Sequence, residues 1–279
     1  MLYARHFPIR RGKLRVINLF AGANIRGQST HRIAALKYGR FKMPCDIKEM
    51  LQRQFYFFGT YFLEEEILRC WQSAARGAKV ILDVGANAGI YSLAALAIEP
   101  DATVHAFEPT PEIASRLRET VELNGLDHLY VHEAAVLSKN GLATLRRFRG
   151  ELGTNEGMNF ITEDIQEFGA ERVQVVSLDQ FCRDHSIARV DLLKLDVQGH
   201  EYSVLAGARS LITAGRVGRI FMELNWSTRP KATCVAARSI RLLESAGYLF
   251  SRPGKRLNWA KAGDWLRGLT DVVAYRAGT

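Results

Sequence analysis

Short apolar runs alternate with amphipathic segments from residue 79 onward. The runs predict strands at Val80–Val84, Thr103–Glu108, Leu129–Glu133, Val190–Asp196 and Arg219–Glu223. Apolar positions at helical spacing predict helices between them, such as Ile90–Ala97 and Pro111–Asn124, the latter stopped by Gly125. This alternation is typical of an α/β fold with a doubly wound, mostly parallel sheet.

Two regions depart from the alternation. The last predicted strands, Tyr248–Ser251 and Asp271–Arg276, are expected to form an antiparallel hairpin at one edge of the sheet. Between the third and fourth strands, Leu142–Phe148 and Arg172–Val176 predict extra strands around a glycine-rich loop, Gly150–Asn159. Long insertions at the carboxyl end of such a sheet usually carry substrate contacts, so we expect this loop to help shape a substrate pocket.

The segment before the sheet contains an aromatic run, Gln54–Phe62, that leads into a predicted helix over Leu63–Ala75. Three glutamates, Glu64 to Glu66, are expected in the first turn of this helix, where carboxylates complement the helix dipole. Most of the aromatic residues are expected to pack against the sheet. Further upstream, short strands are predicted at Leu14–Phe20 and around Phe41–Ile47.

Charge divides the chain of 279 residues unevenly. The net charge is +9, and residues 1–45 hold ten Lys or Arg and no acid, whereas the remainder is nearly neutral. We therefore expect a basic N-terminal extension over residues 1–60 and one catalytic domain over residues 61–279. The basic arm could bind nucleic acid, anionic lipid or an acidic partner, or serve only as a solvated extension.

Composition narrows the class of protein further. No apolar run approaches the roughly 20 residues that cross a bilayer. The four cysteines are widely separated and form no Cys-x-x-Cys pair, so we expect free, buried thiols. The histidines are scattered, and no metal-ligand spacing is present, so no metal is expected. We expect a cytoplasmic protein without a membrane span.

The turn after the first strand has the composition of a nucleotide-binding loop. It reads Asp83-Val84-Gly85-Ala86-Asn87-Ala88-Gly89, and its glycines let the backbone approach a ligand at the N-terminus of a helix. The spacing is Asp-x-Gly-x-x-x-Gly rather than the dinucleotide pattern Gly-x-Gly-x-x-Gly. Side chains at 86 and 87 leave no bare backbone for a diphosphate, which disfavours NAD.

A carboxylate at the end of the second strand supports a ribose site. Glu108, followed by Pro109, lies 19 residues beyond Gly89, where a carboxylate can bind both hydroxyls of a ribose. Together with the loop, it favours S-adenosylmethionine as the cofactor. Glu133 and Ala134, at the end of the third strand, are expected near the adenine.

Polar residues at the fourth strand end are the candidates for catalysis. Asp196, His200 and Glu201 fall within one strand-to-helix turn, close to where a transferred methyl group should sit. His200 suits a general base because its unperturbed pKa is about 6.5. Asp196 could orient His200, bind the ligand's amino group or act as the base itself. The alternatives are a purely structural His200 and a Glu201 that only complements the helix dipole.

Two further features leave alternatives open. Tyr61 either reaches the cofactor with its hydroxyl or packs the extension onto the sheet. Glu223, expected at the end of the fifth strand, adds another carboxylate to the same crevice.

With these motifs in place, the chain resembles the FkbM family of S-adenosylmethionine-dependent methyltransferases. The resemblance spans roughly residues 55–224 and rests on ILDVGANAGIYS from Ile81, AFEPTP from Ala106, EAAVLS from Glu133, VSLDQF from Val176 and DLLKLDVQGHEYSVLAGA from Asp191. It implies a class I methyltransferase fold and O-methylation of a sugar, polyketide or similar hydroxyl. On that pattern Asp83, Gly85, Asn87 and Gly89 would hold the methionine moiety, and Glu108 the ribose.

The chain departs from this pattern after the fourth strand. The family's usual run is Asp-Val-Glu-Gly-Ala-Glu, whereas Gln198 replaces the first Glu and His200 the Ala. Gln198 cannot act as a base, so His200 is our hypothesis for the residue that took over the role.

The expected partner is therefore a small-molecule or saccharide acceptor, whose pocket Pro253–Trp265 would also line. An RNA methyltransferase that grips phosphates with the basic arm is an alternative, although no RNA-binding module is recognisable. A catalytically inactive nucleotide-binding homologue is another.

Overall fold

The computed structural model describes residues 31–39, 41–61, 64–146, 149–150, 153–154, 160–162, 171–226, 230–252, 255–256 and 268–277. The predicted strand Leu14–Phe20 lies outside these ranges. So do most of the loop Gly150–Asn159 and nearly all of Pro253–Trp265, including both of its tryptophans.

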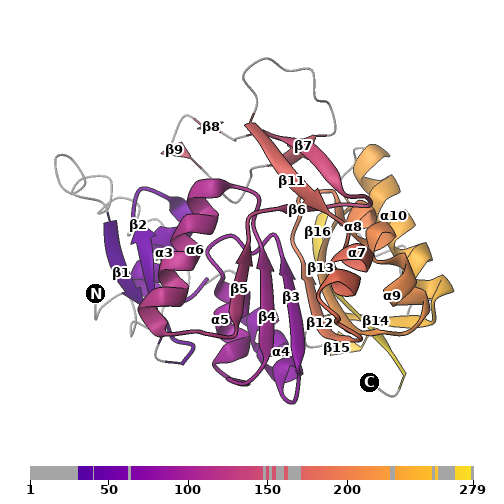
Figure 1. The fold of residues 1–279 in the computed structure, drawn as a ribbon, viewed down its shortest axis with the longest axis horizontal. Helices are drawn as coiled ribbons and strands as arrows, with labels where there is room; N and C mark the ends of the chain where they lie inside the picture. Colours follow the sequence, from indigo (N-terminus) through magenta and orange to yellow (C-terminus); the bar gives the residue numbers. More distant parts are fainter. Residues whose placement is uncertain are drawn as a thin grey trace.

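An eight-stranded sheet forms the centre of the molecule (Figure 1). In spatial order its strands are β15 Lys255–Arg256, β14 Tyr248–Arg252, β16 Gly268–Arg276, β13 Val217–Trp226, β12 Val190–Leu195, β3 Val80–Val84, β4 Thr103–Phe107 and β5 Leu129–His132. The strands from β13 to β5 are parallel, and β16 pairs antiparallel with both β13 and β14. The predicted sheet with an antiparallel edge is confirmed, and its strand order is that of a class I methyltransferase fold.

Helices cover both faces of this sheet. Successive side chains along each strand point to opposite faces, and the side chains on both faces are mostly apolar. One set, which includes Ile81 and Val104, packs with α4 Glu65–Ala75, α5 Ile90–Leu96 and α6 Pro111–Asn124. The other set packs with the second layer of helices: α7 Leu178–Asp184, α8 Glu201–Gly207, α9 Arg209–Thr213 and α10 Pro230–Ser245. The helix predicted at Pro111–Asn124 is confirmed, and it ends at the left-handed Gly125.

In the N-terminal region the strand predicted around Phe41–Ile47 is confirmed, and one further strand and a helix are present that the sequence did not predict. A hairpin pairs β1 His31–Ala35 with β2 Lys42–Asp46, and α3 Met50–Phe58 follows it. The aromatic run therefore ends a helix, with Gly59 as its left-handed cap, instead of only leading into one. Phe55 and Phe58 are buried, which confirms that they pack in the interior.

A second, smaller sheet stands above the main sheet in Figure 1. It contains β10 Phe160–Thr162, β7 Gly141–Arg146, β11 Glu171–Val176 and β6 Ala135–Val136, in that order. The extra strands β7 and β11 are thus confirmed, and they pair antiparallel with each other. A short pair, β8 Arg149–Gly150 and β9 Gly153–Thr154, lies between them in the chain.

Within the described ranges, no helix combines the length and apolar character needed to cross a bilayer. Cys45 and Cys182 are free, buried thiols, as expected, whereas Cys70 is free but only half-buried.

Candidate functional site

The loop after β3 is drawn tightly against the ends of two neighbouring strands. Gly85 and Ala86 donate their backbone N–H groups to the Phe107 carbonyl, at 3.0 and 2.9 Å. Gly85 has a φ of +77°, and a Cβ there would lie 2.0 Å from the Asp196 carbonyl oxygen. Only glycine satisfies both demands, so this residue brings the loop and the end of β12 together.

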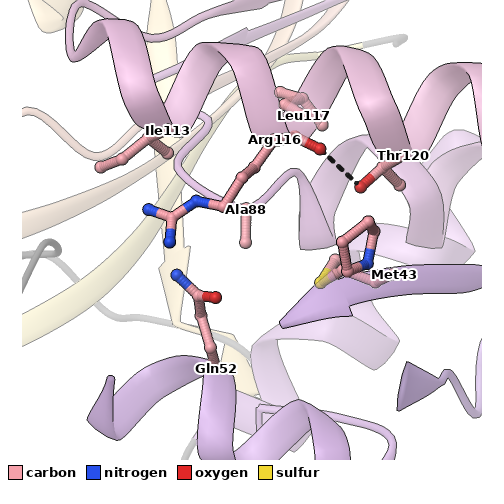
Figure 2. A pocket seen from close by; sticks show the side chains of 8 residues that line it. Met43, Gln52, Ala88, Ile113, Arg116, Leu117 and Thr120 are labelled. Carbon is pink, nitrogen blue, oxygen red and sulfur yellow. Dashed lines mark hydrogen bonds between the residues drawn. The ribbon is translucent and has the colours of Figure 1, made fainter. Parts of the chain in front are cut away.

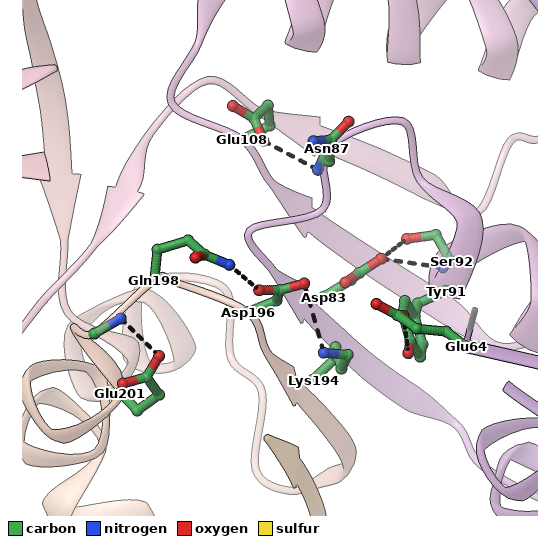
Figure 3. Close-up of polar contacts among 11 residues, drawn as sticks. Glu64, Asp83, Asn87, Tyr91, Ser92, Glu108, Lys194, Asp196, Gln198 and Glu201 are labelled. Atoms are coloured by element: carbon green, nitrogen blue, oxygen red, sulfur yellow. Dashed lines mark hydrogen bonds and ion pairs between the residues drawn. The ribbon is translucent and has the colours of Figure 1, made fainter. Parts of the chain in front are cut away.

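Glu108 is a carboxylate fixed by backbone donors just beyond the end of β4 (Figure 3). It is buried, and its two oxygens accept the backbone N–H groups of Asn87 at 3.0 Å and Thr110 at 2.9 Å. Asn87 itself has a φ of +48°, and its side-chain Oδ1 is buried without a hydrogen-bond partner. A buried carboxylate beside an unsatisfied amide oxygen offers acceptors to a ligand rich in hydroxyls and amines.

Asp83 is buried and serves the fold directly. Its Oδ2 accepts both the backbone N–H and the hydroxyl of Ser92, at 3.0 and 2.7 Å. Ser92 lies in the first turn of α5, so Asp83 satisfies a backbone donor that the helix leaves unpaired. Burial raises the pKa of Asp83, while Ser92 and Lys194 oppose that rise.

Asp196 is held from two sides (Figure 3). The Gln198 side-chain amide donates to Asp196 Oδ1 at 3.0 Å, and the Lys194 ammonium lies 3.8 Å from Oδ2. Gln198 therefore has a positioning contact here, which its family counterpart, a glutamate, could not make as a donor. Its φ of +50° shows that the turn is strained at this residue.

Lys194 is the residue that the sequence analysis missed most clearly. It is 3% exposed, and its Nζ also lies 4.6 Å from the centre of the Tyr91 ring. Although burial alone lowers its pKa, Asp196 and then Glu64 raise it, and the net direction is upward, so the ammonium is retained. The available signal was a lysine inside an otherwise apolar strand, because lysines are almost never buried unless paired.

The turn after Asp196 leads into α8. His200 is the half-buried residue that precedes the helix, and its backbone N–H donates to the Val197 carbonyl at 3.2 Å. Glu201 lies in the first turn, as expected, and accepts the Gly199 N–H at 2.9 Å. The structure thus brings His200 and Glu201 into the same turn as Asp196.

The predicted role of Glu64 in the first turn of α4 is wrong, because the helix begins one residue later, at Glu65. Glu64 is instead a half-buried carboxylate that accepts the Tyr91 hydroxyl at 2.6 Å. Tyr61 is half-buried, and burial followed by the nearby Glu64 raises its pKa to about 12. Both residues face the charges around Asp196.

The predicted position of Glu223 at a strand end is also wrong. Strand β13 continues to Trp226, because the antiparallel partner β16 pairs with it from Arg219 to Trp226. Glu223 lies directly opposite Asp271 in that ladder. Sequence reasoning placed Asp271 in an edge hairpin and gave it no functional role.

Glu133 lies farther from the buried charges. Strand β5 ends one residue before it, at His132, and the Glu133 side chain is 41% exposed. Its Oε2 accepts a hydrogen bond from Arg118 at 3.0 Å. Ala134 is buried and Pro109 half-buried, and their predicted cofactor contacts stay predictions.

Two hollows lie outside this crevice. A small cavity between β2, α3 and α6 reaches Ala88 of the loop, and the Arg116 side chain extends across it above Gln52 (Figure 2). A groove of about 720 Å³ lies at the opposite, amino ends of the strands, beside His105 and His132. Burial lowers the pKa of both histidines to about 4, so they are uncharged at neutral pH.

Across the described part of the chain, no group of three or more His, Cys, Asp or Glu is arranged to hold a metal ion. The donor set fits S-adenosylmethionine instead. Glu108 offers a buried carboxylate for ribose hydroxyls, and the Asn87 oxygen offers an acceptor that the protein leaves unused. Nearby carboxylates suit a ligand that carries an ammonium and a sulfonium charge.

Relatives with known names support this fit. The chain is 30% identical to the 2-O-methyltransferase NoeI of Sinorhizobium fredii, over 49% of this chain and 60% of that protein. It is 31% identical to the 31-O-demethyl-FK506 methyltransferase FkbM of Streptomyces tacrolimicus, over 52% of this chain and 67% of that one. It is 24% identical to the hexuronic acid methyltransferase AglP of Haloferax volcanii, over 60% and 65%. The match to NoeI thus covers less than two thirds of that relative.

The family model of the methyltransferase FkbM domain matches residues 83–250, which is more than half of the chain and extends from the end of β3 into β14. The resemblance seen in the sequence is therefore confirmed: the chain belongs to the FkbM family of S-adenosylmethionine-dependent methyltransferases.

Proposed function

We propose that this protein transfers a methyl group from S-adenosylmethionine to a hydroxyl group of a sugar, glycan or other natural product. The observation that carries the proposal is a pair of sites just beyond the carboxyl ends of β4 and β12. Glu108, fixed by two backbone N–H groups, lies on one side, and Asp196, held by Gln198 and Lys194, lies on the other. The names of NoeI and FkbM, which are O-methyltransferases, support the same reaction class.

The roles follow from the chemistry of these groups. Glu108 would bind the ribose hydroxyls, the loop from Gly85 to Gly89 the methionine moiety, and Tyr61 its carboxylate. When bound, S-adenosylmethionine supplies an activated methyl group on a sulfonium. Asp196 and His200, which share the turn after β12, would align the acceptor or take its proton.

Binding is the first test of this proposal. Isothermal titration should show saturable binding of S-adenosylhomocysteine and no binding of NAD, because the loop lacks room for a diphosphate. Folded protein that binds NAD but not S-adenosylhomocysteine would overturn the proposal.

The acceptor is then sought by measuring S-adenosylhomocysteine release with a panel of free sugars, glycosides and macrolides. With an active acceptor, Asp196→Asn and His200→Ala separate the two candidates. Loss of kcat in His200→Ala with unchanged S-adenosylhomocysteine affinity is expected if the histidine is catalytic. Unchanged turnover would show that His200 only precedes the helix. If S-adenosylhomocysteine is released when RNA is the acceptor, and this release falls steeply as the salt concentration rises, an RNA acceptor would be favoured instead.

We retain the division into a basic extension, residues 1–60, and a catalytic domain, residues 61–279, as part of this proposal. Buried residues of β1, β2 and α3, including Met43 and Phe55, join the core that also contains Ile81. A variant that begins at residue 61 should therefore lose stability, whereas one that begins at residue 31 should keep its cofactor affinity.

A further inference from the structure

Three carboxylates lie side by side across β12, β13 and β16. The pairing of β12 with β13 places Leu195 opposite Met222, so the next residues, Asp196 and Glu223, are neighbours. The pairing of β13 with β16 places Glu223 opposite Asp271. Residues that are opposite one another share a face of the sheet. We call Asp196, Glu223 and Asp271 the carboxylate row.

One buried cation, Lys194, lies beside the carboxylate row and offsets part of its negative charge. Lys194 lies two residues before Asp196 and therefore on the same face, and its Nζ is 3.8 Å from Asp196 Oδ2. Its charge also acts on Glu223, Asp271 and Glu64. Arg252 adds a second positive charge near Asp271. The acids still outnumber the cations at the centre of the row, and burial leaves little water to screen them.

Crowding of these groups makes two of the glutamates easy to protonate near neutral pH. Burial, followed by repulsion from Asp196 and Asp271, raises the pKa of Glu223 to about 7. Burial also raises the pKa of Glu64 to about 7, although Lys194 and the Tyr91 hydroxyl oppose the rise. Tyr61, the remaining titratable neighbour, stays protonated because its own pKa is raised to about 12.

We propose that Glu223, held between Asp196 and Asp271, is the general base of the methyl transfer, so that of their two proposed roles Asp196 and His200 keep only that of aligning the acceptor. This inference rests on the proposed function. The acceptor hydroxyl gives its proton to the Glu223 carboxylate as its oxygen bonds to the methyl carbon. The carbon–sulfur bond breaks, and its electron pair stays on the sulfur, which leaves as a neutral thioether.

Geometry separates Glu223 from the other candidate, Glu64. The Glu64 carboxylate already accepts the Tyr91 hydroxyl at 2.6 Å. Among the residues that the structure describes, none donates a hydrogen bond to the Glu223 side chain, so its oxygens are available to a substrate hydroxyl. The charges also balance in the step: a sulfonium and a carboxylate become a thioether and a carboxylic acid, and a buried site favours that neutralisation.

The protonation of Glu223 can be tested by cofactor binding alone, without an acceptor. The sulfonium charge of S-adenosylmethionine should hold Glu223 ionised, whereas the thioether S-adenosylhomocysteine should not. At pH 7 a group with a pKa of about 7 is about half protonated. Binding of S-adenosylmethionine should therefore release up to about half a proton, and binding of S-adenosylhomocysteine almost none.

Isothermal titration at pH 7 in phosphate and in Tris measures this release, because the two buffers differ in their heats of ionisation. Glu223→Gln should lose at least half of the proton release and bind S-adenosylmethionine several-fold more weakly, with unchanged S-adenosylhomocysteine affinity. Glu244→Gln, a change at an exposed position on α10, is the matched control and should behave as the wild type. Near-ultraviolet circular dichroism checks that each variant folds.

Asp271→Asn is a second variant that keeps the inference testable if Glu223→Gln does not fold. Removing the Asp271 charge should lower the Glu223 pKa, so the proton release should shrink at pH 7 and persist at pH 6. Equal release with both ligands, or a release that disappears in Glu64→Gln and persists in Glu223→Gln, would overturn the assignment of Glu223. Failure of both ligands to bind would overturn the proposed function itself.

Discussion

Glu108 and Glu223 are both glutamates near the carboxyl edge of one sheet, yet their surroundings differ. Glu108 accepts two backbone N–H groups, which fix the orientation of its carboxylate. Glu223 has carboxylates on both neighbouring strands and only the shared charge of Lys194 to oppose them. The first environment suits a group that binds, and the second suits a group that exchanges a proton.

The same contrast divides the crevice into halves. In the cofactor half, on β3 and β4, the carboxylates are satisfied by donors from the loop and α5. In the half on β12, β13 and β16, they are set against one another. Residue type therefore does not decide the role of a carboxylate here, whereas its backbone partners and the charges on adjacent strands do.

Of the substitutions that we propose, replacement of Lys194 should have the largest effect on stability. Lys194→Met leaves buried carboxylates unpaired, so the free energy of unfolding should fall by about 3–5 kcal/mol at pH 8, measured by urea denaturation. Lys139→Met, at an exposed position, should change it by less than about 0.5 kcal/mol.

The loss of unfolding free energy caused by Lys194→Met should become smaller as the pH falls from 8 to 6. The pKa values of Glu64 and Glu223 are raised from 4.5 to about 7, so the folded protein binds protons more strongly than the unfolded chain between these values. Acidification through this window therefore adds stability. A loss that is independent of pH would contradict the view that these carboxylates repel one another.

Gly85 lets the loop after β3 pack closely against the end of β12, and its replacement should disrupt this packing. Gly85→Ala should lower the free energy of unfolding by about 3 kcal/mol, because the new Cβ meets the Asp196 carbonyl and the φ of +77° is unfavourable. Gly77→Ala is the matched control, since Gly77 has a φ of +73° and a Cβ added there would meet no atom of the described residues within 4 Å, and should cost about 1 kcal/mol. Equal losses would mean that only the backbone angle matters.

Glu108→Gln should affect binding more than folding. An amide N–H₂ group would face one of the backbone donors of Asn87 or Thr110, and a charged acceptor would be lost. We expect S-adenosylhomocysteine affinity to fall about 10- to 100-fold by isothermal titration. Glu122→Gln, on the exposed side of α6, should leave it unchanged. An unchanged affinity in Glu108→Gln would remove this residue from the ribose site.

Glu133→Gln should have the smallest effect. The side chain is 41% exposed and paired with Arg118, and an exposed ion pair contributes less than about 1 kcal/mol. S-adenosylhomocysteine affinity should change by less than about fivefold. A loss of tenfold or more would place Glu133 in direct contact with the cofactor.

Much of the cofactor half could be predicted from the sequence. The apolar strand, the glycine loop and Glu108 are contiguous in the chain or joined by one helix, so their spacing fixes their relative positions. The carboxylate row could not be predicted in this way. Asp196, Glu223 and Asp271 come from three strands, and the long pairing of β13 with β16 moved Glu223 from a strand end into a ladder.

By itself, then, the sequence determined the alternation of strands and helices, the loop from Gly85 to Gly89 and the family to which the chain belongs, because these depend on local spacing and composition. Only the tertiary structure decided which charges face one another. In the sequence, Lys194 is an unexplained charge in an apolar strand. The strand register explains it, because it places Lys194 opposite Asp83 and near Asp196. Electrostatic interactions depend on distance in space and on burial, and neither is a property of spacing along the chain.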